Sequence, residues 1–172
     1  MENPYYESTV PLLIKSLSTL HGILDKAAAY ADSKKFDVKI LLNARLSPDQ
    51  YHFIKQVQVA CDNAKGCGAR LAGKEVPKHE DTEQTVTDLK QRLDKTISYL
   101  KTIKPSDFDG VADRKITLPW MPDKYLYGHD YATQFVMQNF YFHLTTAYAI
   151  LRHNGVDLGK GDYLGQLNWK NK

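Results

Sequence analysis

Cysteine is scarce in this sequence of 172 residues, in which only Cys61 and Cys67 occur. Both fall within one expected helix, where six residues separate two side chains by roughly 9 Å along the axis. That separation is too long for a disulfide bond. Two unpaired thiols are typical of a protein in a reducing compartment, so we expect a cytoplasmic location.

Signals for export and for membrane insertion are also missing. The opening, MENPYYESTVPLL, lacks the basic stretch and apolar core of a signal peptide. The longest mainly apolar stretch, residues 135–151, falls short of the roughly 20 apolar residues that cross a membrane. It is further interrupted by five polar residues: Gln138, Asn139, His143, Thr145 and Thr146. We therefore expect no membrane partner.

No strong excess of one charge is present. Basic residues number 23 and acidic residues 20, for a net charge of +3, and no run of five basic residues occurs. Scattered charge of this kind is typical of a solvated surface. We therefore expect no nucleic-acid partner.

Common catalytic motifs are absent as well. There is no CxxC pair and no nucleophile elbow, and the glycines around Lys160 lack the strand and helix that flank a phosphate-binding loop. The histidines are dispersed, with no two of them three or four residues apart: His21, His52, His79, His129, His143 and His153. A zinc or iron site would have to collect ligands from several helices. We expect no cofactor, and a divalent metal is the alternative.

Four segments do carry a clear pattern, with apolar residues at the three- and four-residue spacing of amphipathic helices. They span residues 6–31, 47–71, 81–103 (or 82–103) and 130–154. Ser47 and Pro48 predict the start of the second helix, and Gly73 predicts its end. Gly155 is the expected left-handed residue after the last helix.

Residues 113–128 change to an alternating pattern around the turn-like sequence PWMPD, which predicts a short β-hairpin. Trp120 in this turn is either a packed cap or a lid over a pocket. The sequence thus predicts an all-α protein, a four-helix bundle with a small β-hairpin between the third and fourth helices. Residues 1–172 form one domain in this interpretation.

The last helix carries a candidate polar site. At 100° per residue His143 lies on an apolar face of this helix, and Asn139 stands beside it one turn earlier. On the second helix Gln56 lies at the margin of the apolar face and is the expected partner of His143, whereas His52, Gln58 and Asp62 fall well outside that face. A buried imidazole needs a hydrogen-bond partner. The alternatives are a core histidine satisfied by a neighbouring helix, and a ligand-binding or catalytic site.

The last helix is apolar on a second side too. Met137, Tyr141, Leu144 and Tyr148 lie there, and a helix with two apolar faces needs a cover for both. The hairpin and the glycine-rich tail after residue 156 are one expected cover. A two-fold homodimer that pairs the aromatic faces is the other.

Three stretches resemble one known family across nearly the whole chain: QVQVACD at residues 56–62, NFYFHLTTAYAILRHNGV at 139–156 and LGKGDYLG at 158–165. The sequence is similar to the family catalogued as domain of unknown function 1993. That family is placed among the DinB-like and YfiT-like metalloenzymes. The resemblance implies a four-helix bundle with an up-down-down-up course.

The wider superfamily holds a divalent metal with one histidine from the second helix and two histidines four residues apart on the fourth. His143 matches the second member of that pair. The first member falls on Asn139 and the second-helix ligand falls near Gln56, and carboxamides are poor ligands for zinc or nickel. The resemblance therefore implies the fold and the place of a pocket, and it leaves one of the three ligands.

Three functions follow as hypotheses. The first is a small-molecule-binding protein or metal-free enzyme with a pocket formed by Gln56, Asn139 and His143, in which His143 would act as acid or base. The second is a residual metal-dependent enzyme that uses His143 with carboxamides. The third is a structural or interaction protein without catalysis.

Overall fold

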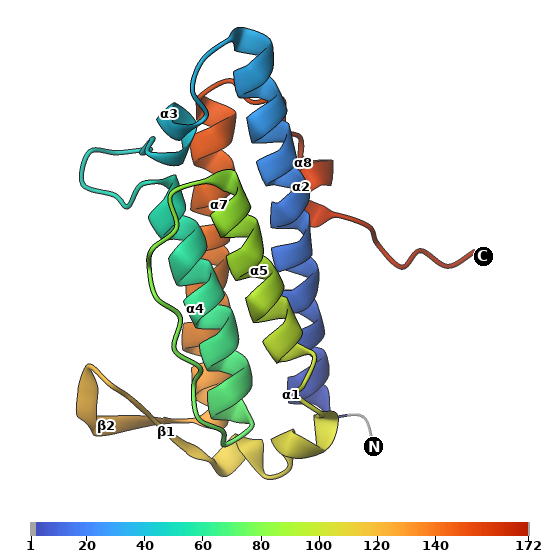
Figure 1. Ribbon diagram of the computed structural model, residues 1–172. Helices are drawn as coiled ribbons and strands as arrows, with labels where there is room; N and C mark the ends of the chain where they lie inside the picture. Colours follow the sequence, from blue (N-terminus) through green and yellow to red (C-terminus); the bar gives the residue numbers. More distant parts are fainter. Residues whose placement is uncertain (1–2, 172) are drawn as a thin grey trace.

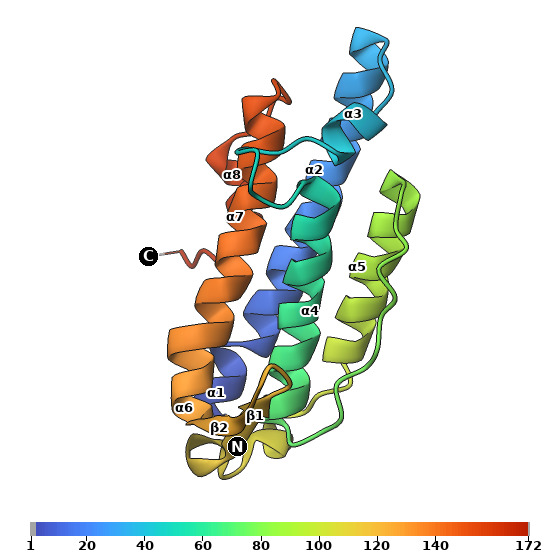
Figure 2. The ribbon, with the colours of Figure 1, turned by 90° about the vertical axis from the view of Figure 1, so that its left-hand side faces the viewer.

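Four long helices lie side by side in the computed structural model, which describes residues 3–171 (Figure 1 and Figure 2). They are α2 (Val10–Lys34), α4 (Phe53–Leu71), α5 (Val86–Leu100) and α7 (Met137–His153). In Figure 1 α2 and α7 run upward whereas α4 and α5 run downward, which is the up-down-down-up course. The predicted four-helix bundle with this course is confirmed. Residues 1, 2 and 172 of the expected single domain lie outside the described residues.

The connection between α4 and α5 is unusually extended. Because both helices point the same way, residues 72–85 must return along the whole length of α4 before α5 can begin (Figure 1). This connection covers a face of α4 that would otherwise be exposed. Its contacts bury several charged side chains.

The predicted hairpin is present as β1 (Lys115–Leu118) and β2 (Met121–Tyr127). The strands pair antiparallel, with Lys115 opposite Tyr127, and the register shifts after Thr117. Two short 3-10 turns, η1 (Pro105–Phe108) and η2 (Val111–Asp113), lead into it. The hairpin lies at the lower end of the bundle, beside α4 and the start of the last helix (Figure 1).

The last helix is not uniform. It begins with α6 (Gly128–Asp130), continues through η3 (Tyr131–Val136), which is π-helical, and only then becomes α7. The sequence predicted one regular helix over residues 130–154. A π-helical turn uses the same residue types as an α-helix and leaves no periodic signature, although such turns occur often at functional sites. The predicted end is confirmed, since Gly155 has a φ of 90°.

Two helix starts differ from the sequence prediction. The Ser47 hydroxyl bonds the Asp49 carboxylate at 2.6 Å within a local turn, so α4 begins at Phe53 and not at Ser47. Polar side chains that bond their own neighbours compete in this way with helix formation. The third long helix begins at Val86 and not near residue 81, because Thr85 and Asp88 form a capping box there.

Short helices complete the fold: α1 (Pro4–Glu7), α3 (Lys39–Leu42) and α8 (Lys160–Leu164). The first predicted helix is therefore divided into α1 and α2. Pro11 lies in the first turn of α2, where its missing N–H and its ring prevent the helix from continuing through residue 7. No helix among the described residues is long and apolar enough to cross a membrane.

Candidate functional site

The interface between α4 and the last helix carries three polar pairs. Gln56, Asn63 and Arg70 are spaced by seven residues on α4, which keeps them on one stripe of the helix. Because the two helices run antiparallel, their partners come in reverse order along the chain. They are His143, Asn139 and Tyr131 respectively.

The first pair confirms the predicted contact between Gln56 and His143. The Nδ1 atom of His143 lies 2.7 Å from Oε1 of Gln56, and both side chains are buried. Gln56 Nε2 donates to the carbonyl of Tyr51 at 3.0 Å, which fixes the orientation of the amide. Since Oε1 can only accept, Nδ1 of His143 carries the proton and Nε2 is left with its lone pair. Burial lowers the pKa of His143, which favours the neutral ring.

The second pair corrects the predicted pocket. Asn139 does not join His143 and Gln56, but donates from Nδ2 to Oδ1 of Asn63 at 2.9 Å. Asn63 in turn donates to the carbonyl of Val59 at 2.9 Å. Asn139 and His143 lie on one face of α7, four residues apart. Their partners on α4, Asn63 and Gln56, are seven residues apart, so the two side chains contact different turns of α4.

The third pair was not predicted. Arg70 Nη1 donates to the hydroxyl of Tyr131 at 3.2 Å. Tyr131 belongs to the π-helical turn and is 1% exposed, and burial raises the pKa of its hydroxyl to about 12. The seven-residue spacing of Gln56, Asn63 and Arg70 is the sequence signal that could have indicated a polar contact of Arg70 with the last helix.

The second and third pairs line one cavity of about 350 Å³, which we call the Asn139 cavity. Its walls come from α4, the residue 72–85 connection, the hairpin, the π-helical turn and α7. Three aromatic residues line it: the Phe135 ring is stacked with that of Tyr131, with centroids 5.8 Å apart, and lies 6.3 Å from that of Trp120. The other lining residues are Val59, Asp62, Asn63, Lys65, Arg70, Val76 and Asn139. Trp120 is 63% exposed, so it stands at the rim of this cavity.

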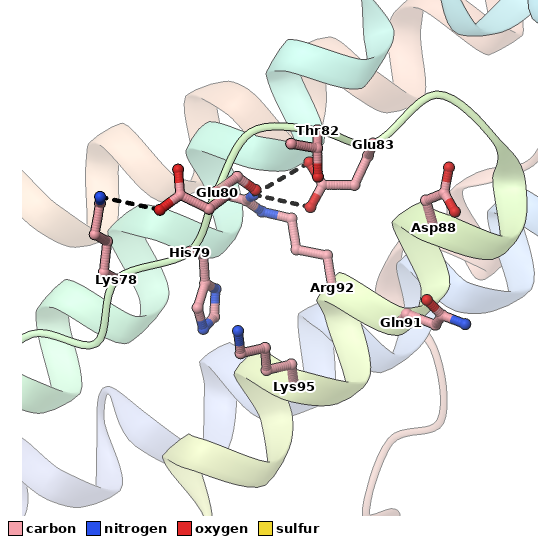
Figure 3. A pocket seen from close by; sticks show the side chains of 9 residues that line it. All are labelled: Lys78, His79, Glu80, Thr82, Glu83, Asp88, Gln91, Arg92 and Lys95. Atoms are coloured by element: carbon pink, nitrogen blue, oxygen red, sulfur yellow. Dashed lines mark hydrogen bonds and ion pairs between the residues drawn. The ribbon is translucent and has the colours of Figure 1, made fainter.

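A charged cluster lies on the neighbouring face of α4, where the connection crosses it. Arg92 of α5 has a 1% exposed side chain that bonds Glu83 at 3.0 Å, Asp62 at 2.8 Å and Asp81 at 3.0 Å (Figure 3 shows the bonds to Glu83 and to the Glu80 carbonyl). Gln58 is also buried here and donates to Glu83 at 2.8 Å. The apolar pattern placed Gln58 and Asp62 outside the packed face of α4. Gln58 is instead buried by the connection through Glu83, whereas Asp62 stays partly exposed and pairs with Lys65 and Arg92.

A hollow of about 360 Å³ opens beside this cluster, between the connection and α5. His79 and Lys95 approach each other across it (Figure 3). Burial and the charges of Lys65, Lys95 and Arg92 lower the pKa of His79 to about 4. The carboxylates here are engaged in ion pairs or in the helix cap, so the cluster serves to attach the connection to the bundle.

The second apolar side of the last helix is covered in part by the tail of the same chain. Tyr148 packs edge-on against Tyr163 of α8, with ring centroids 5.7 Å apart, and Leu144 is 1% exposed. Phe142 remains 54% exposed. It lies beside a surface hollow of about 470 Å³ that Leu46 also lines.

The residues at the expected metal position do not fit a transition metal. His143 is bonded through Nδ1 to an amide oxygen, and Asn139 is held by Asn63 in a separate cavity. Among residues 3–171, no three His, Cys, Asp or Glu side chains are grouped to hold a metal ion. Carboxamide oxygen is a weak ligand for zinc, nickel or iron.

Comparison with known proteins identifies relatives of the whole chain. Residues 5–164 match the family model described as "Domain of unknown function (DUF1993)". The crystal structure of a DinB family member from Shewanella denitrificans is 46% identical in sequence. It covers 97% of this chain and 95% of its own, with a TM-score of 0.94. No match to a curated protein was found.

Proposed function

Since the chain belongs to the DUF1993 family and shares its fold with a DinB family member, we propose that it binds a small organic molecule in the Asn139 cavity without using a metal. One observation carries the proposal. The cavity combines a wall of three aromatic rings with amide and guanidinium groups that are fixed by the packing of α4 against the last helix. Five of the ten lining residues are apolar or aromatic, and ligand sites typically combine such side chains with oriented polar groups.

The location of the cavity supports the same function. It lies where the bundle, the hairpin and the π-helical turn meet, and only one of its aromatic residues, Trp120, is largely exposed. In the metal-bearing superfamily that the sequence resembles, position 139 corresponds to one of the metal ligands. Here that position presents an amide, which suits recognition of a polar organic group better than metal binding.

A metal-free enzyme is the second candidate, and His143 would be its acid or base. The His143 Nδ1–H donates to Gln56, which leaves Nε2 of a neutral imidazole free to accept a proton. Tyr51 stacks on the ring, with centroids 6.5 Å apart, and is itself half exposed. His143 does not line the Asn139 cavity, so this function would require a substrate that approaches along Tyr51.

We also propose that the chain forms a homodimer through an aromatic patch, defined here as Leu46, Tyr51 and Phe142. These side chains are 44%, 52% and 54% exposed. Leu46 and Phe142 line one surface hollow, and the rings of Phe142 and Tyr51 both pack against that of His143. Large aromatic residues are enriched in interface cores, and a two-fold axis would bury this patch against its own copy.

A cytoplasmic location completes the proposal. Cys61 and Cys67 are both free and fully buried. Burial raises the pKa of each thiol to about 12, so neither is a reactive thiolate. Unpaired cysteines of this kind are typical of reducing compartments.

The binding function can be tested with Trp120 as the reporter. The Trp169→Phe variant removes the other tryptophan, which is 84% exposed in the tail. A library of small organic molecules is then screened by tryptophan fluorescence and by thermal shift. Ligands of the cavity should change the Trp120 emission and raise the melting temperature.

The site is assigned with Asn139→Leu, and Gln138→Leu is the matched control because that amide is exposed and bonds the carbonyl of Thr133 on its own helix. Ligand affinity should fall about tenfold or more in Asn139→Leu, since one oriented hydrogen bond is lost and a polar partner is left unpaired. It should be unchanged in Gln138→Leu. If no compound binds, or if both variants bind equally well, the cavity is not a ligand site.

A further inference from the structure

Arg70 differs from the other cations near the Asn139 cavity. Lys65 is paired with Asp62 at 2.8 Å, and Asp62 is shared with Arg92. Among residues 3–171, Arg70 has no carboxylate partner, and its one side-chain hydrogen bond goes to Tyr131. A half-buried guanidinium without a counter-ion gives this end of the cavity an uncompensated positive charge.

Gly66 creates the space in which this guanidinium lies. A Cβ atom at position 66 would be 2.3 Å from Nη1 of Arg70. The absence of a side chain therefore lets Arg70 fold back along α4 toward Tyr131. Because Nη1 donates to the Tyr131 oxygen, the phenol proton is not used in that bond.

Two donors thus lie side by side at one end of the cavity. The raised pKa of Tyr131 keeps its hydroxyl protonated, so the phenol and the guanidinium can both donate to one ligand group. Paired donors of this kind match the two oxygens of a carboxylate.

The opposite end offers a different group. Asn139 uses Nδ2 to donate to Asn63, and no group among residues 3–171 donates to its Oδ1. This oxygen is therefore an acceptor for a hydroxyl or amino group. The Arg70 guanidinium lies beside Gly66. Gly66 is three residues from Asn63 on α4, which corresponds to roughly 5 Å along the helix axis.

Three aromatic residues also line the cavity. Tyr131 and Phe135 are stacked with an interplanar angle of 25°, and Trp120 lies tilted beside Phe135. Such a wall favours a planar ligand, because ring stacking adds to the burial of apolar area.

We propose that the Asn139 cavity binds a small aromatic carboxylate. Its carboxylate bonds Arg70 and Tyr131, its ring packs along Phe135 and Trp120, and a hydroxyl or amino group at its far end donates to Oδ1 of Asn139. This inference rests on the proposed binding function and specifies the class of ligand.

The test compares 4-hydroxybenzoate with 4-hydroxybenzamide, which has the same shape without the charge. Affinities are measured by titration calorimetry and by Trp120 fluorescence in the Trp169→Phe chain. The carboxylate should bind about tenfold or more tightly than the amide, because charge-assisted hydrogen bonds are the stronger ones. Equal affinities, or no binding of 4-hydroxybenzoate at millimolar concentration, overturn the inference.

Variants then assign the preference to Arg70. Arg70→Gln should remove the preference for the carboxylate, whereas Arg152→Gln, an exposed arginine of α7, should keep it. Gly66→Ala retains the charge but displaces the guanidinium, and should weaken 4-hydroxybenzoate binding. The control Gly22→Ala, where a Cβ meets no atom within 4 Å, should not. A preference that survives both Arg70→Gln and Gly66→Ala contradicts the proposed carboxylate site.

The two proposals fail in different ways. If library compounds bind in an Asn139-dependent manner but the acid and the amide bind equally, the binding function stands and the ligand class is wrong. If no compound of any class depends on Asn139, the binding function itself is wrong. Circular dichroism of each variant confirms that the bundle is folded before its affinity is compared.

Discussion

The amide of Gln56 determines which nitrogen of His143 carries a proton. Its Oε1 atom lies 2.7 Å from Nδ1 of His143, while its Nε2 atom is held by the carbonyl of Tyr51. The imidazole is therefore the Nδ1–H tautomer, with Nε2 as the basic atom. A core histidine satisfied by its neighbour and a histidine poised as a base share this arrangement, so the bond must be tested directly.

Replacement of Gln56 by Leu should remove the preference of His143 for the Nδ1–H tautomer, because the acceptor of that proton is lost. We expect the two-bond ¹H–¹⁵N spectrum of histidine-labelled native protein to show His143 as Nδ1–H, and that of Gln56→Leu to shift toward Nε2–H. The free energy of unfolding should fall by about 1–3 kcal/mol, because a buried N–H loses its acceptor. Gln138→Leu, which replaces an exposed amide, should change neither quantity. A native spectrum with Nε2–H would contradict the assignment.

His79 should make stability depend on pH. Its pKa is lowered from 6.5 to about 4 in the folded protein by burial and by neighbouring cations. The unfolded chain therefore binds the proton first, so this contribution to stability is fully present above pH 6.5 and is lost as the pH falls toward 4. We expect His79→Gln to lose less unfolding free energy across this window than the native chain does.

Urea unfolding at the two ends of the window measures this effect. His153→Gln, at an exposed position of the same residue type, is the control and should follow the native protein. Since burial also lowers the pKa values of His52 and His143, a residual pH dependence should remain in His79→Gln. Parallel curves for native and His79→Gln proteins would show that the His79 ring titrates normally.

The sequence predicted the bundle because its helices obey a simple rule. The buried positions of an amphipathic helix recur every three or four residues, whichever element packs against it. The residue pattern alone therefore defines the four long helices. The helix start at Ser47 was wrong because the hydroxyl found a closer partner in Asp49. Local side-chain bonds of this kind depend on the conformation of the turn and not on helix periodicity.

The site was predicted in part for the same reason. A helical wheel places Gln56 and His143 on facing surfaces, and they do meet. It cannot say which turn of α4 faces Asn139, because that depends on how the two helices are aligned along their axes. The cavity also needs Tyr131 from the π-helical turn and Trp120 from the hairpin, and their placement is a property of the assembled fold.

Arg92 should be essential for holding the residue 72–85 connection on α4. Its buried guanidinium pairs with Glu83, Asp62 and Asp81. Arg92→Met leaves partly buried carboxylates without a partner, and we expect a loss of about 3–5 kcal/mol in the free energy of unfolding. Urea denaturation provides the measurement.

The matched control is Lys78→Met, which also removes a cation paired with an acid of the connection. Both members of the Lys78–Glu80 pair are exposed, by 85% and 69%. Exposed ion pairs contribute about 1 kcal/mol or less, so this variant should retain nearly native stability. Similar losses in the two variants would mean that the buried cluster does not attach the connection.

Metal content should be low in protein purified without chelator or metal-affinity resin. We expect less than about 0.2 equivalents of zinc, nickel or iron, because amide oxygens replace two of the three imidazole ligands. Inductively coupled plasma mass spectrometry gives the content. The double variant Gln56→His with Asn139→His serves as a positive control, since it supplies the ligand types of the metal-bearing relatives. A stoichiometric metal bound to His143 in the native chain would revive the metalloenzyme hypothesis.

Self-association should depend on Phe142 and not on Tyr148. Tyr148 is packed by Tyr163 of its own chain, whereas Phe142 belongs to the exposed aromatic patch with Leu46 and Tyr51. Light scattering after size exclusion at micromolar concentration should give twice the chain mass of 19.6 kDa for the native protein. Phe142→Glu should yield folded monomers, because a charge at the centre of a two-fold interface meets its own copy.

Tyr148→Glu provides the contrast. This substitution should lower the melting temperature, because it places a charge between α7 and α8, but it should leave the folded fraction dimeric. A native monomer would contradict the proposed dimer. The tail of the same chain would then be the cover of the last helix, and the aromatic patch would stay exposed. A dimer that persists in Phe142→Glu would place the interface elsewhere on the molecule.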